Sequence, residues 1–320
     1  MNNIYNFLIL IRYKNLIIIA LTHSLIKFFL VNPYISSPAL SIISFIIFLF
    51  SLLTIVAGGY VINDIYDIEN DIINKPETRV IGLKIKKETA LKSYFILSLL
   101  GLFSSIYLSY LINKLWYCLI FIFFIYSLWK YSKNYKTSFV FGNIQVAFLT
   151  ALSIFTLAIY DIIASGIRIE NSTKTIFNII LIYCGFSFIT TLIREILKDL
   201  EDIKGDTIIN ANTLAINFGK SKTKKIVSLL IIVPIVGIGF FQYFQYSVLS
   251  TTFSTPISYW GINIVSSYYT LLIQLLLVSL LIKTNLSETQ LDFHHSSSLC
   301  KIIMIVGILS IPLNHFLYKS

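Results

Sequence analysis

The run Ala39–Asp71, with the sequence ALSIISFIIFLFSLLTIVAGGYVINDIYDIEND, joins a long apolar stretch directly to a cluster of acidic residues. Residues 39–62 contain no charged side chain and exceed the roughly 20 residues that an α-helix needs to cross a bilayer. The carboxylates begin at Asp64, where the apolar stretch stops. The run therefore predicts a membrane-spanning helix that ends in carboxylates at one face of the membrane.

The composition extends this prediction to the whole chain. Of its 320 residues, 56% are hydrophobic and only 12% are charged, whereas soluble domains carry about 25% charged residues. The apolar runs are continuous rather than alternating, which favours helices over a β-barrel as the structure in lipid. We expect one all-α domain, residues 1–320, forming a polytopic membrane bundle of about nine transmembrane helices at roughly 15–32, 39–62, 92–112, 115–131, 139–160, 175–197, 226–246, 264–282 and 300–318.

A second acidic cluster follows another apolar run, at Glu195–Asp206 with the sequence EILKDLEDIKGD. Segments 64–88 and 195–206 together hold 11 of the 15 acidic residues of the chain. If the helices continue through the clusters, a spacing of three or four residues places the acidic side chains on one side of each helix. We call the predicted oxygen ligands the first aspartate stripe (Asn63, Asp64, Asp67 and Asp71) and the second aspartate stripe (Asp199, Asp202 and Asp206).

The chemistry of these side chains points to a hard metal ion. Carboxylate and amide oxygens with no His or Cys nearby favour Mg²⁺ or Ca²⁺ over zinc. Carboxylates at the C-terminal end of a helix also oppose the helix dipole, so we expect a cation to offset their charge. Basic residues within and beside the clusters could hold an anion, namely Lys75, Arg79, Arg194 and Lys198. This combination predicts a site in which Mg²⁺ bridges the protein to a polyphosphate.

The distribution of basic residues predicts the orientation. If the N-terminus is cytoplasmic, the cytoplasmic segments hold 20 of the 25 Lys and Arg residues, and the outer segments hold only Lys114, Arg168, Lys174 and Lys319. Positive residues gather in the cytoplasmic loops of membrane proteins. We therefore expect a multi-pass protein of the inner (cytoplasmic) membrane, with its N-terminus and both stripes in the cytoplasm. The same asymmetry explains the net charge of +10 without a nucleic-acid partner.

With these motifs in place, the sequence resembles the UbiA-type intramembrane prenyltransferases. The first stripe, followed by Asn74-Lys75-Pro76 and Arg79, is similar to the first signature of that family, and the second stripe is similar to its second signature. Tyr126-Ser127 with Lys130, and Gly142-Asn143 further on, resemble its middle segment. The resemblance covers roughly residues 12–320. It implies a helical bundle around a central cavity, Mg²⁺ as cofactor, and an allylic prenyl diphosphate as a substrate.

The resemblance also implies roles for individual residues. The catalytic carboxylates would be Asp64, Asp67, Asp199 and Asp202, which hold Mg²⁺ against the diphosphate. Substrate contacts would come from basic, amide and aromatic side chains, namely Lys75, Arg79, Tyr126, Lys130, Asn143, Arg194 and Lys198.

The acceptor is indicated by the second cluster. The form Arg194-Glu195-x-x-Lys198-Asp199-x-Glu201-Asp202-x-x-Gly205-Asp206 is most similar to the branch that transfers geranylgeranyl to a geranylgeranylglyceryl phosphate ether lipid. An alternative acceptor is an aromatic quinone precursor of the 4-hydroxybenzoate or menaquinone type. A membrane transporter is the alternative from another class, and it would place the carboxylates near the bilayer midplane rather than at helix ends.

Three further features receive simpler interpretations. Lys27 lies within the first predicted span, and we expect its ammonium group to reach the outer surface along a flexible stem. Cys118, Cys184 and Cys300 fit no metal or redox spacing, so we expect them to behave as small apolar residues. The polar, uncharged segment 247–267 falls on the outer face.

Overall fold

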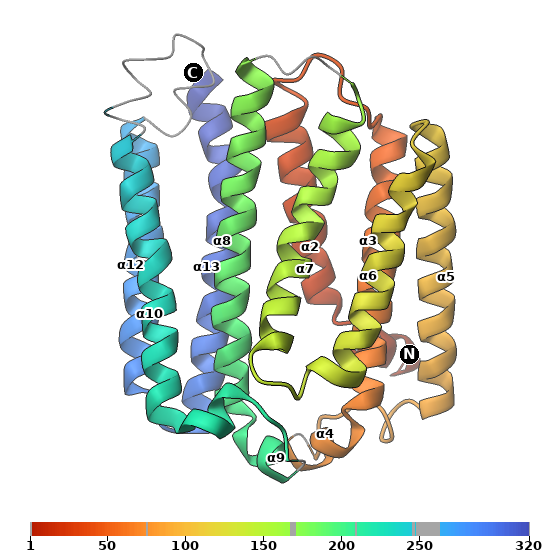
Figure 1. Cartoon of the computed structure of the whole chain (residues 1–320), viewed down its shortest axis with the longest axis vertical. Coiled ribbons are helices and arrows are strands. Elements are labelled where there is room, and N and C mark those ends of the chain that lie inside the picture. The colour runs from red at the N-terminus through yellow and green to blue at the C-terminus, as the bar shows by residue number, and fades with distance from the viewer. Residues whose placement is uncertain are drawn as a thin grey trace.

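The computed structural model describes residues 2–74, 76–166, 171–208, 210–244, 247 and 263–319. Over these ranges the secondary structure is helical, with no β-strand. Nine of the described helical segments are long and apolar enough to cross a membrane. The predicted all-α membrane bundle is therefore confirmed (Figure 1). Most of the segment 247–267, and the predicted contact residue Lys75, lie outside the described residues.

The bundle consists of nine long segments and three short helices. The long segments are α2 (Tyr13–Leu25) with its π-helical end (Ile26–Val31), α3 (Ile42–Tyr66), α5 (Lys87–Leu111), α6 (Cys118–Lys130) with a preceding 3-10 turn (Leu115–Tyr117) and a π-helical end (Tyr131–Tyr135), α7 (Phe141–Ala158) with its π-helical end (Ile159–Ile163), α8 (Asn171–Glu201), α10 (Leu214–Phe244), α12 (Ile264–Leu286) and α13 (Gln290–Lys319). The short helices are α1 (Asn2–Leu10), α4 (Ile68–Asn74) and α9 (Ile203–Ile208).

Several helices extend beyond the apolar runs that predicted them. α5 begins at Lys87 instead of near residue 92, α10 at Leu214 instead of near 226, and α13 at Gln290 instead of near 300. An apolar run marks only the part of a helix that lipid can surround, whereas the backbone can continue its hydrogen bonds into water. Within α10 the helix is interrupted at Gly219, whose φ of +72° is favourable only for glycine.

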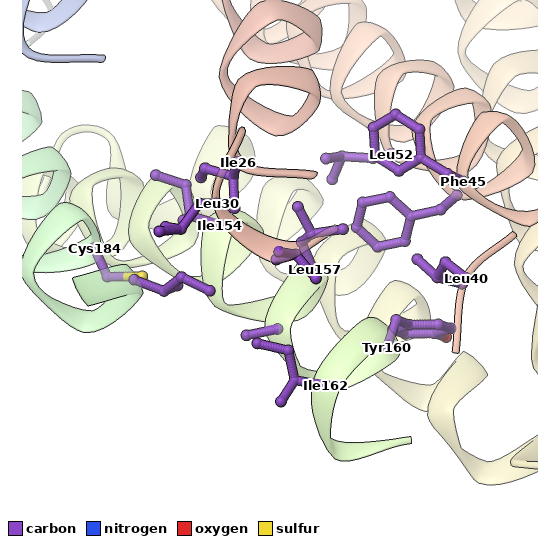
Figure 2. Packing of buried hydrophobic residues seen from close by; sticks show 14 of the residues in the cluster. Ile26, Leu30, Leu40, Phe45, Leu52, Ile154, Leu157, Tyr160, Ile162 and Cys184 are labelled. Atoms are coloured by element: carbon purple, nitrogen blue, oxygen red, sulfur yellow. The ribbon is translucent and has the colours of Figure 1, made fainter. Parts of the chain in front are cut away.

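Apolar side chains hold the bundle together in separate cores. The largest core joins α2, α3, α6, α7 and α8, and Figure 2 shows Phe45, Leu157 and Tyr160 within it. A second core joins α8, α10, α12 and α13, and a smaller one packs α1 on the C-terminal half of α3 through Leu10 and Val61. Because α3 and α8 are anchored in these cores, their C-terminal ends are fixed in position.

Both acidic clusters leave the helix at an equivalent point. α3 ends at Tyr66, and Asp67, with φ −88° and ψ 1°, leads into α4. α8 ends at Glu201, and Asp202 leads into α9. The sequence prediction assumed that each helix continues through its acidic cluster. Because both helices end within the clusters, neither stripe is one continuous helical face. Instead α4 and α9 lie side by side across one end of the bundle (Figure 1), which we call the aspartate end.

Lys27 does not reach the surface as expected. Its Nζ donates to Asp161 Oδ2 at 2.7 Å and to the Leu40 carbonyl at 2.7 Å. The Lys27 and Asp161 side chains are only 1% and 0% exposed, and Asp161 also accepts from the Leu40 N–H at 2.9 Å. The expectation was wrong because a partner 134 positions away neutralises the ammonium group inside the bundle.

Candidate active site

Two cations from distant parts of the chain hold the first aspartate stripe. Arg12 Nη2 donates to Asp64 Oδ1 at 2.8 Å, and Lys136 forms an ion pair with Asp67. Asn63 Nδ2 donates to Asp67 Oδ2 at 2.7 Å. Burial opposes the charged form of Arg12 and Lys136, but the neighbouring carboxylates outweigh it and raise both pKa values. Both cations therefore stay charged and offset part of the negative charge of the stripe.

Asparagine amides hold the second aspartate stripe. Asn143 Nδ2 of α7 donates to Asp199 Oδ2 at 2.8 Å, and Asn70 Nδ2 of α4 donates to Asp206 Oδ1 at 3.2 Å. Burial raises the pKa of Asp206 to about 6, and the negative charge of Asp202 adds to the shift. Burial and the neighbouring carboxylate therefore make the ionised form of Asp206 costly in the absence of a bound cation.

The short helices α4 and α9 join the two stripes directly. Asn74 Oδ1 accepts from the Gly205 N–H at 3.0 Å, and Asn74 Nδ2 donates to Asn70 Oδ1 at 3.1 Å. A Cβ atom on Gly205 would lie 2.1 Å from Asn70 Oδ1, so this approach requires glycine. We call the contacts among Asn70, Asn74, Gly205 and Asp206 the asparagine clasp. The clasp fixes the position of one signature segment relative to the other.

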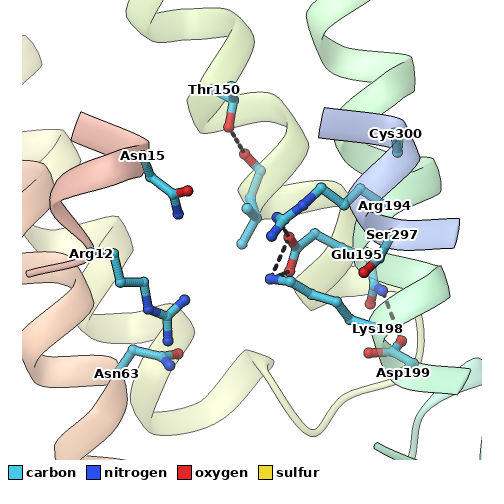
Figure 3. Close-up of polar contacts among 12 residues, drawn as sticks. Arg12, Asn15, Asn63, Thr150, Arg194, Glu195, Lys198, Asp199, Ser297 and Cys300 are labelled. Atoms are coloured by element: carbon cyan, nitrogen blue, oxygen red, sulfur yellow. Dashed lines mark hydrogen bonds and ion pairs between the residues drawn. The ribbon is translucent and has the colours of Figure 1, made fainter. Parts of the chain in front are cut away.

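A group of mainly basic side chains lies deeper along α8. Figure 3 shows Arg194, Glu195 and Lys198 extending from α8 toward Arg12. Glu195 Oε1 accepts from Arg194 Nη1 at 2.7 Å and from Lys198 Nζ at 2.8 Å. Arg194 Nε is buried and has no hydrogen-bond partner in the part of the chain that the structure describes. This group therefore has a donor available for a ligand.

An apolar cavity lies still further from the aspartate end, between α2, α7, α8 and α13. Tyr183 and Phe186 line it together with Thr150 and Thr190, and Thr190 lies about one turn from Arg194 along α8. The cavity holds about 80 Å³, which is room for only a few water molecules. A long prenyl chain would enter only if side chains around the cavity moved.

Some of the predicted substrate-contact residues lie beside the acidic residues of the site, and others contact aromatic rings. Asn143 contacts the second stripe, and Arg194 and Lys198 share Glu195. Tyr126 is 55% exposed and packs against a neighbouring tryptophan, and Lys130 Nζ lies 5.7 Å from the centre of a neighbouring tyrosine ring. Tyr126 and Lys130 therefore contact aromatic rings of their own helical segment, and these contacts do not involve the aspartate stripes.

The sequence predicted no role for several residues that contact the stripes or the basic side chains. Arg12, Asn70 and Lys136 were not selected at all, and Asn74 and Glu195 were selected only as members of the two motifs. Arg12 and Lys136 lie 52 and 69 positions from their carboxylate partners, so no local spacing could pair them. The one available signal was their position, because both are basic residues at the ends of predicted spans on the same side as the stripes.

The donor set of the stripes fits Mg²⁺. All predicted ligands offer carboxylate or amide oxygens, and Mg²⁺ binds through one or two carboxylates while water and phosphate oxygens complete its shell. Over the described residues, no three His, Cys, Asp or Glu side chains converge on one point.

The fold and the site together define a polytopic helical membrane protein with opposed aspartate segments at one end. The sequence profile of the UbiA prenyltransferase family matches residues 24–282, and the chain belongs to this family. The chain is thus an enzyme, a prenyltransferase.

Individual relatives agree with this assignment. Digeranylgeranylglyceryl phosphate synthase of Sulfolobus acidocaldarius is 35% identical over 236 residues, which cover 73% of this chain and 74% of the relative. A solved structure concerned with the biosynthesis of digeranylgeranylglyceryl phosphate synthase in membranes is 24% identical, with a TM-score of 0.58 over 98% of this chain and 99% of the other. A UbiA homolog from Archaeoglobus fulgidus bound to GPP and Mg²⁺ is 14% identical, with a TM-score of 0.57 over 96% and 99%. The two structural likenesses establish the fold.

Proposed function

We propose that the chain transfers a geranylgeranyl group from its diphosphate to the hydroxyl of a geranylgeranylglyceryl phosphate-type ether lipid, with Mg²⁺ as cofactor. The observation that carries this proposal is the pair of aspartate stripes, joined by the asparagine clasp, at the end of a bundle that encloses an apolar cavity. The name of the Sulfolobus acidocaldarius relative supports this acceptor class.

The stripes are the metal-binding part of this proposal. Bound Mg²⁺ would neutralise the diphosphate as negative charge builds on its leaving oxygen. The proposed ligands are Asn63, Asp64, Asp67, Asp71, Asp199, Asp202 and Asp206, of which Asp64, Asp67, Asp199 and Asp202 are the catalytic carboxylates. Arg12 and Lys136 keep two further positive charges beside these carboxylates. The Mg²⁺-bound Archaeoglobus fulgidus homolog, which shares the fold, supports the choice of metal.

Other residues would bind and orient the substrates. Asn143 holds Asp199 by a hydrogen bond, and we assign to Tyr126 an aromatic face for the allylic group. The contacts to substrate phosphates would come from the predicted basic residues, namely Lys75, Arg79, Lys130, Arg194 and Lys198. Arg suits two-point contact with phosphate oxygens, and Lys acts as a point charge.

The reaction exchanges one carbon–oxygen bond for another. The bond between the allylic carbon and the diphosphate breaks, and the acceptor hydroxyl oxygen forms the new bond to that carbon. The hydroxyl proton leaves to the departing diphosphate or to a carboxylate of the stripes. Exclusion of water from around the allylic carbon favours transfer to the acceptor over hydrolysis of the prenyl diphosphate.

The arrangement in the membrane is part of the proposal. The basic-residue distribution supports a cytoplasmic N-terminus and a cytoplasmic aspartate end, with the lipid bilayer as a partner and no nucleic acid. The carboxylates lie in the last turns of α3 and α8 or just after them instead of at mid-span, which argues against the transporter alternative.

A transfer assay tests the proposed function. We expect purified protein to convert labelled geranylgeranyl diphosphate to product with the ether-lipid acceptor and Mg²⁺, and not after chelation of the metal. Asp67→Ala and Asp199→Ala should each lower transfer by about 100-fold or more, the scale of losing a major charge-stabilising group. Glu69→Ala is the matched control, since Glu69 is an exposed acid of the same segment.

Two outcomes would contradict the assignment. Full activity in both aspartate variants would remove the metal site from the stripes. Transfer to 4-hydroxybenzoate or a menaquinone precursor, with none to the ether lipid, would replace the proposed acceptor by the aromatic class.

A further inference from the structure

We infer that Arg194, Lys198 and Lys301 bind the phosphate monoester of the acceptor lipid, at a position deeper in the bundle than the diphosphate. We call these three residues the basic cluster. The inference rests on the proposed function, because it identifies which part of the same site receives the acceptor and by what chemistry.

The three cations come from two adjacent helices. Arg194 and Lys198 are one turn apart on α8 and both contact Glu195. On α13, Ser297 and Lys301 are likewise one turn apart, and Figure 3 shows Ser297 beside Arg194. Cys300 Sγ donates to the Thr190 carbonyl at 3.2 Å, which places this part of α13 beside α8. Arg194 and Lys301 are close enough to interact electrostatically.

The charges of the basic cluster do not balance. Arg194 and Lys198 share one carboxylate, Glu195, and Arg194 and Glu195 are mostly buried. Lys301 adds a third positive charge, and the acids near it are Glu195 and Glu201, of which Glu201 is already paired with His294. Unbalanced charge at membrane depth is costly unless a partner neutralises it. A phosphate monoester carries about −1.5 to −2 charges at pH 7 and would offset the remaining positive charge, and Arg194 Nε is a buried donor without a partner in the described chain.

The two substrates therefore have complementary positions. The stripes carry excess negative charge and suit a diphosphate only with a metal, whereas the basic cluster suits a phosphate without one. Five residues separate Arg194 from Asp199, or about 7.5 Å along α8. Only a few bonds separate the hydroxyl of a glycerol phosphate from its phosphate, so a phosphate at the basic cluster leaves the hydroxyl close to the diphosphate. The apolar cavity beyond Thr190 lies on the side of the cluster away from the stripes.

Equilibrium binding to the full-length protein in detergent with Mg²⁺ tests the inference. The probes are geranylgeranylglyceryl phosphate, its dephosphorylated alcohol, inorganic phosphate and geranylgeranyl diphosphate. We expect the wild type to bind the phosphorylated lipid about tenfold or more tightly than the alcohol, the scale of a hydrogen bond to a charged group. Lys301→Gln should lose most of this preference, Lys301→Arg should keep it, and both should bind the diphosphate as the wild type does.

Matched controls separate the basic cluster from charge in general. Lys222→Gln removes an exposed cation of α10 and should change none of the four affinities. Inorganic phosphate should bind much more weakly than the phosphorylated lipid, because it lacks the chain. Equal binding of inorganic phosphate and lipid would overturn the assignment to a lipid acceptor.

Three further results are decisive. A wild type that does not distinguish the phosphorylated lipid from the alcohol overturns the inference, even if every variant fails to fold. A Lys301→Gln variant that loses affinity for the diphosphate instead assigns the cluster to that substrate and also overturns it. A protein that binds the phosphorylated lipid through Lys301 but transfers prenyl groups only to another acceptor contradicts the proposed function and leaves the phosphate site in place.

Discussion

Gly205 is the residue through which α9 approaches α4 most closely. Its N–H donates to Asn74 Oδ1, and its Cα faces Asn70 with no room for a side chain. The neighbouring Asp206 accepts a hydrogen bond from Asn70 Nδ2. A single glycine therefore determines how near the second aspartate stripe can come to the first.

We predict that Gly205→Ala separates α4 from α9. The added methyl group should lower the free energy of unfolding by about 1–3 kcal/mol, the usual cost of an overpacked contact, and should reduce prenyl transfer. Thermal denaturation in detergent and the transfer assay measure the two effects. Gly185→Ala on α8 is the matched control, because nothing lies within 4 Å of a Cβ atom there. Indistinguishable behaviour of the two variants would show that the clasp does not organise the site.

At the same scale, the sequence predicts which carboxylates are ligands but not which side chains hold them. Spacing and apolar context were enough to select Asp64, Asp67, Asp199 and Asp202, because both signals are local. The cations Arg12 and Lys136 come from the ends of other helices. Their pairing with the carboxylates depends on how the helices pack, and helix packing cannot be predicted from the sequence of a single segment.

At the scale of elements, apolar runs located the helices but not their ends. The spans near residues 226 and 300 begin about 10 residues too late, because α10 and α13 continue as polar helix outside the apolar region. The break at Asp67 and the start of α4 were also not predicted. Local sequence there contains no Pro or Gly to stop a helix, and the asparagine clasp supplies the tertiary contact that redirects the chain.

The π-helical ends of α2 and α7, Ile26–Val31 and Ile159–Ile163, are tied by the buried pair of Lys27 and Asp161. We predict that Lys27→Met lowers the free energy of unfolding by about 3–5 kcal/mol, because it leaves a buried carboxylate without its cation. Combining it with Asp161→Leu should recover much of this loss. Thermal denaturation of the single and double variants measures both effects.

Lys14→Met serves as the matched control for this pair, since Lys14 is exposed on the same segment. A double variant that is less stable than either single variant would mean that the ion pair is needed for more than charge balance.

At the scale of the whole molecule, the described helices form an odd number of membrane passages, and the two chain ends lie toward opposite ends of the bundle (Figure 1). Sequence alone predicted this count because each passage has its own apolar run. It did not predict which helices neighbour one another, such as α7 with α8 or α8 with α13, since apolar faces of similar composition fit many partners.

We predict opposite labelling of two single-cysteine variants in sealed cells. In a background without Cys118, Cys184 and Cys300, a membrane-impermeant thiol reagent should label Lys114→Cys from outside and Glu69→Cys only after the membrane is opened. The basis is the excess of basic residues at the aspartate end. The reverse pattern would place the stripes on the outer side.

The asparagine clasp has a consequence for how this chain can change in length. Inserting one residue into an α-helix rotates everything beyond it by about 100°. An insertion between Asp67 and Asn74, or between Asp202 and Gly205, would turn one half of the clasp away from the other. The connection between α5 and the next helical segment, residues 112–114, does not touch the clasp and escapes this geometric restriction. Insertions and deletions should therefore be tolerated there and not in the two short segments that carry the clasp.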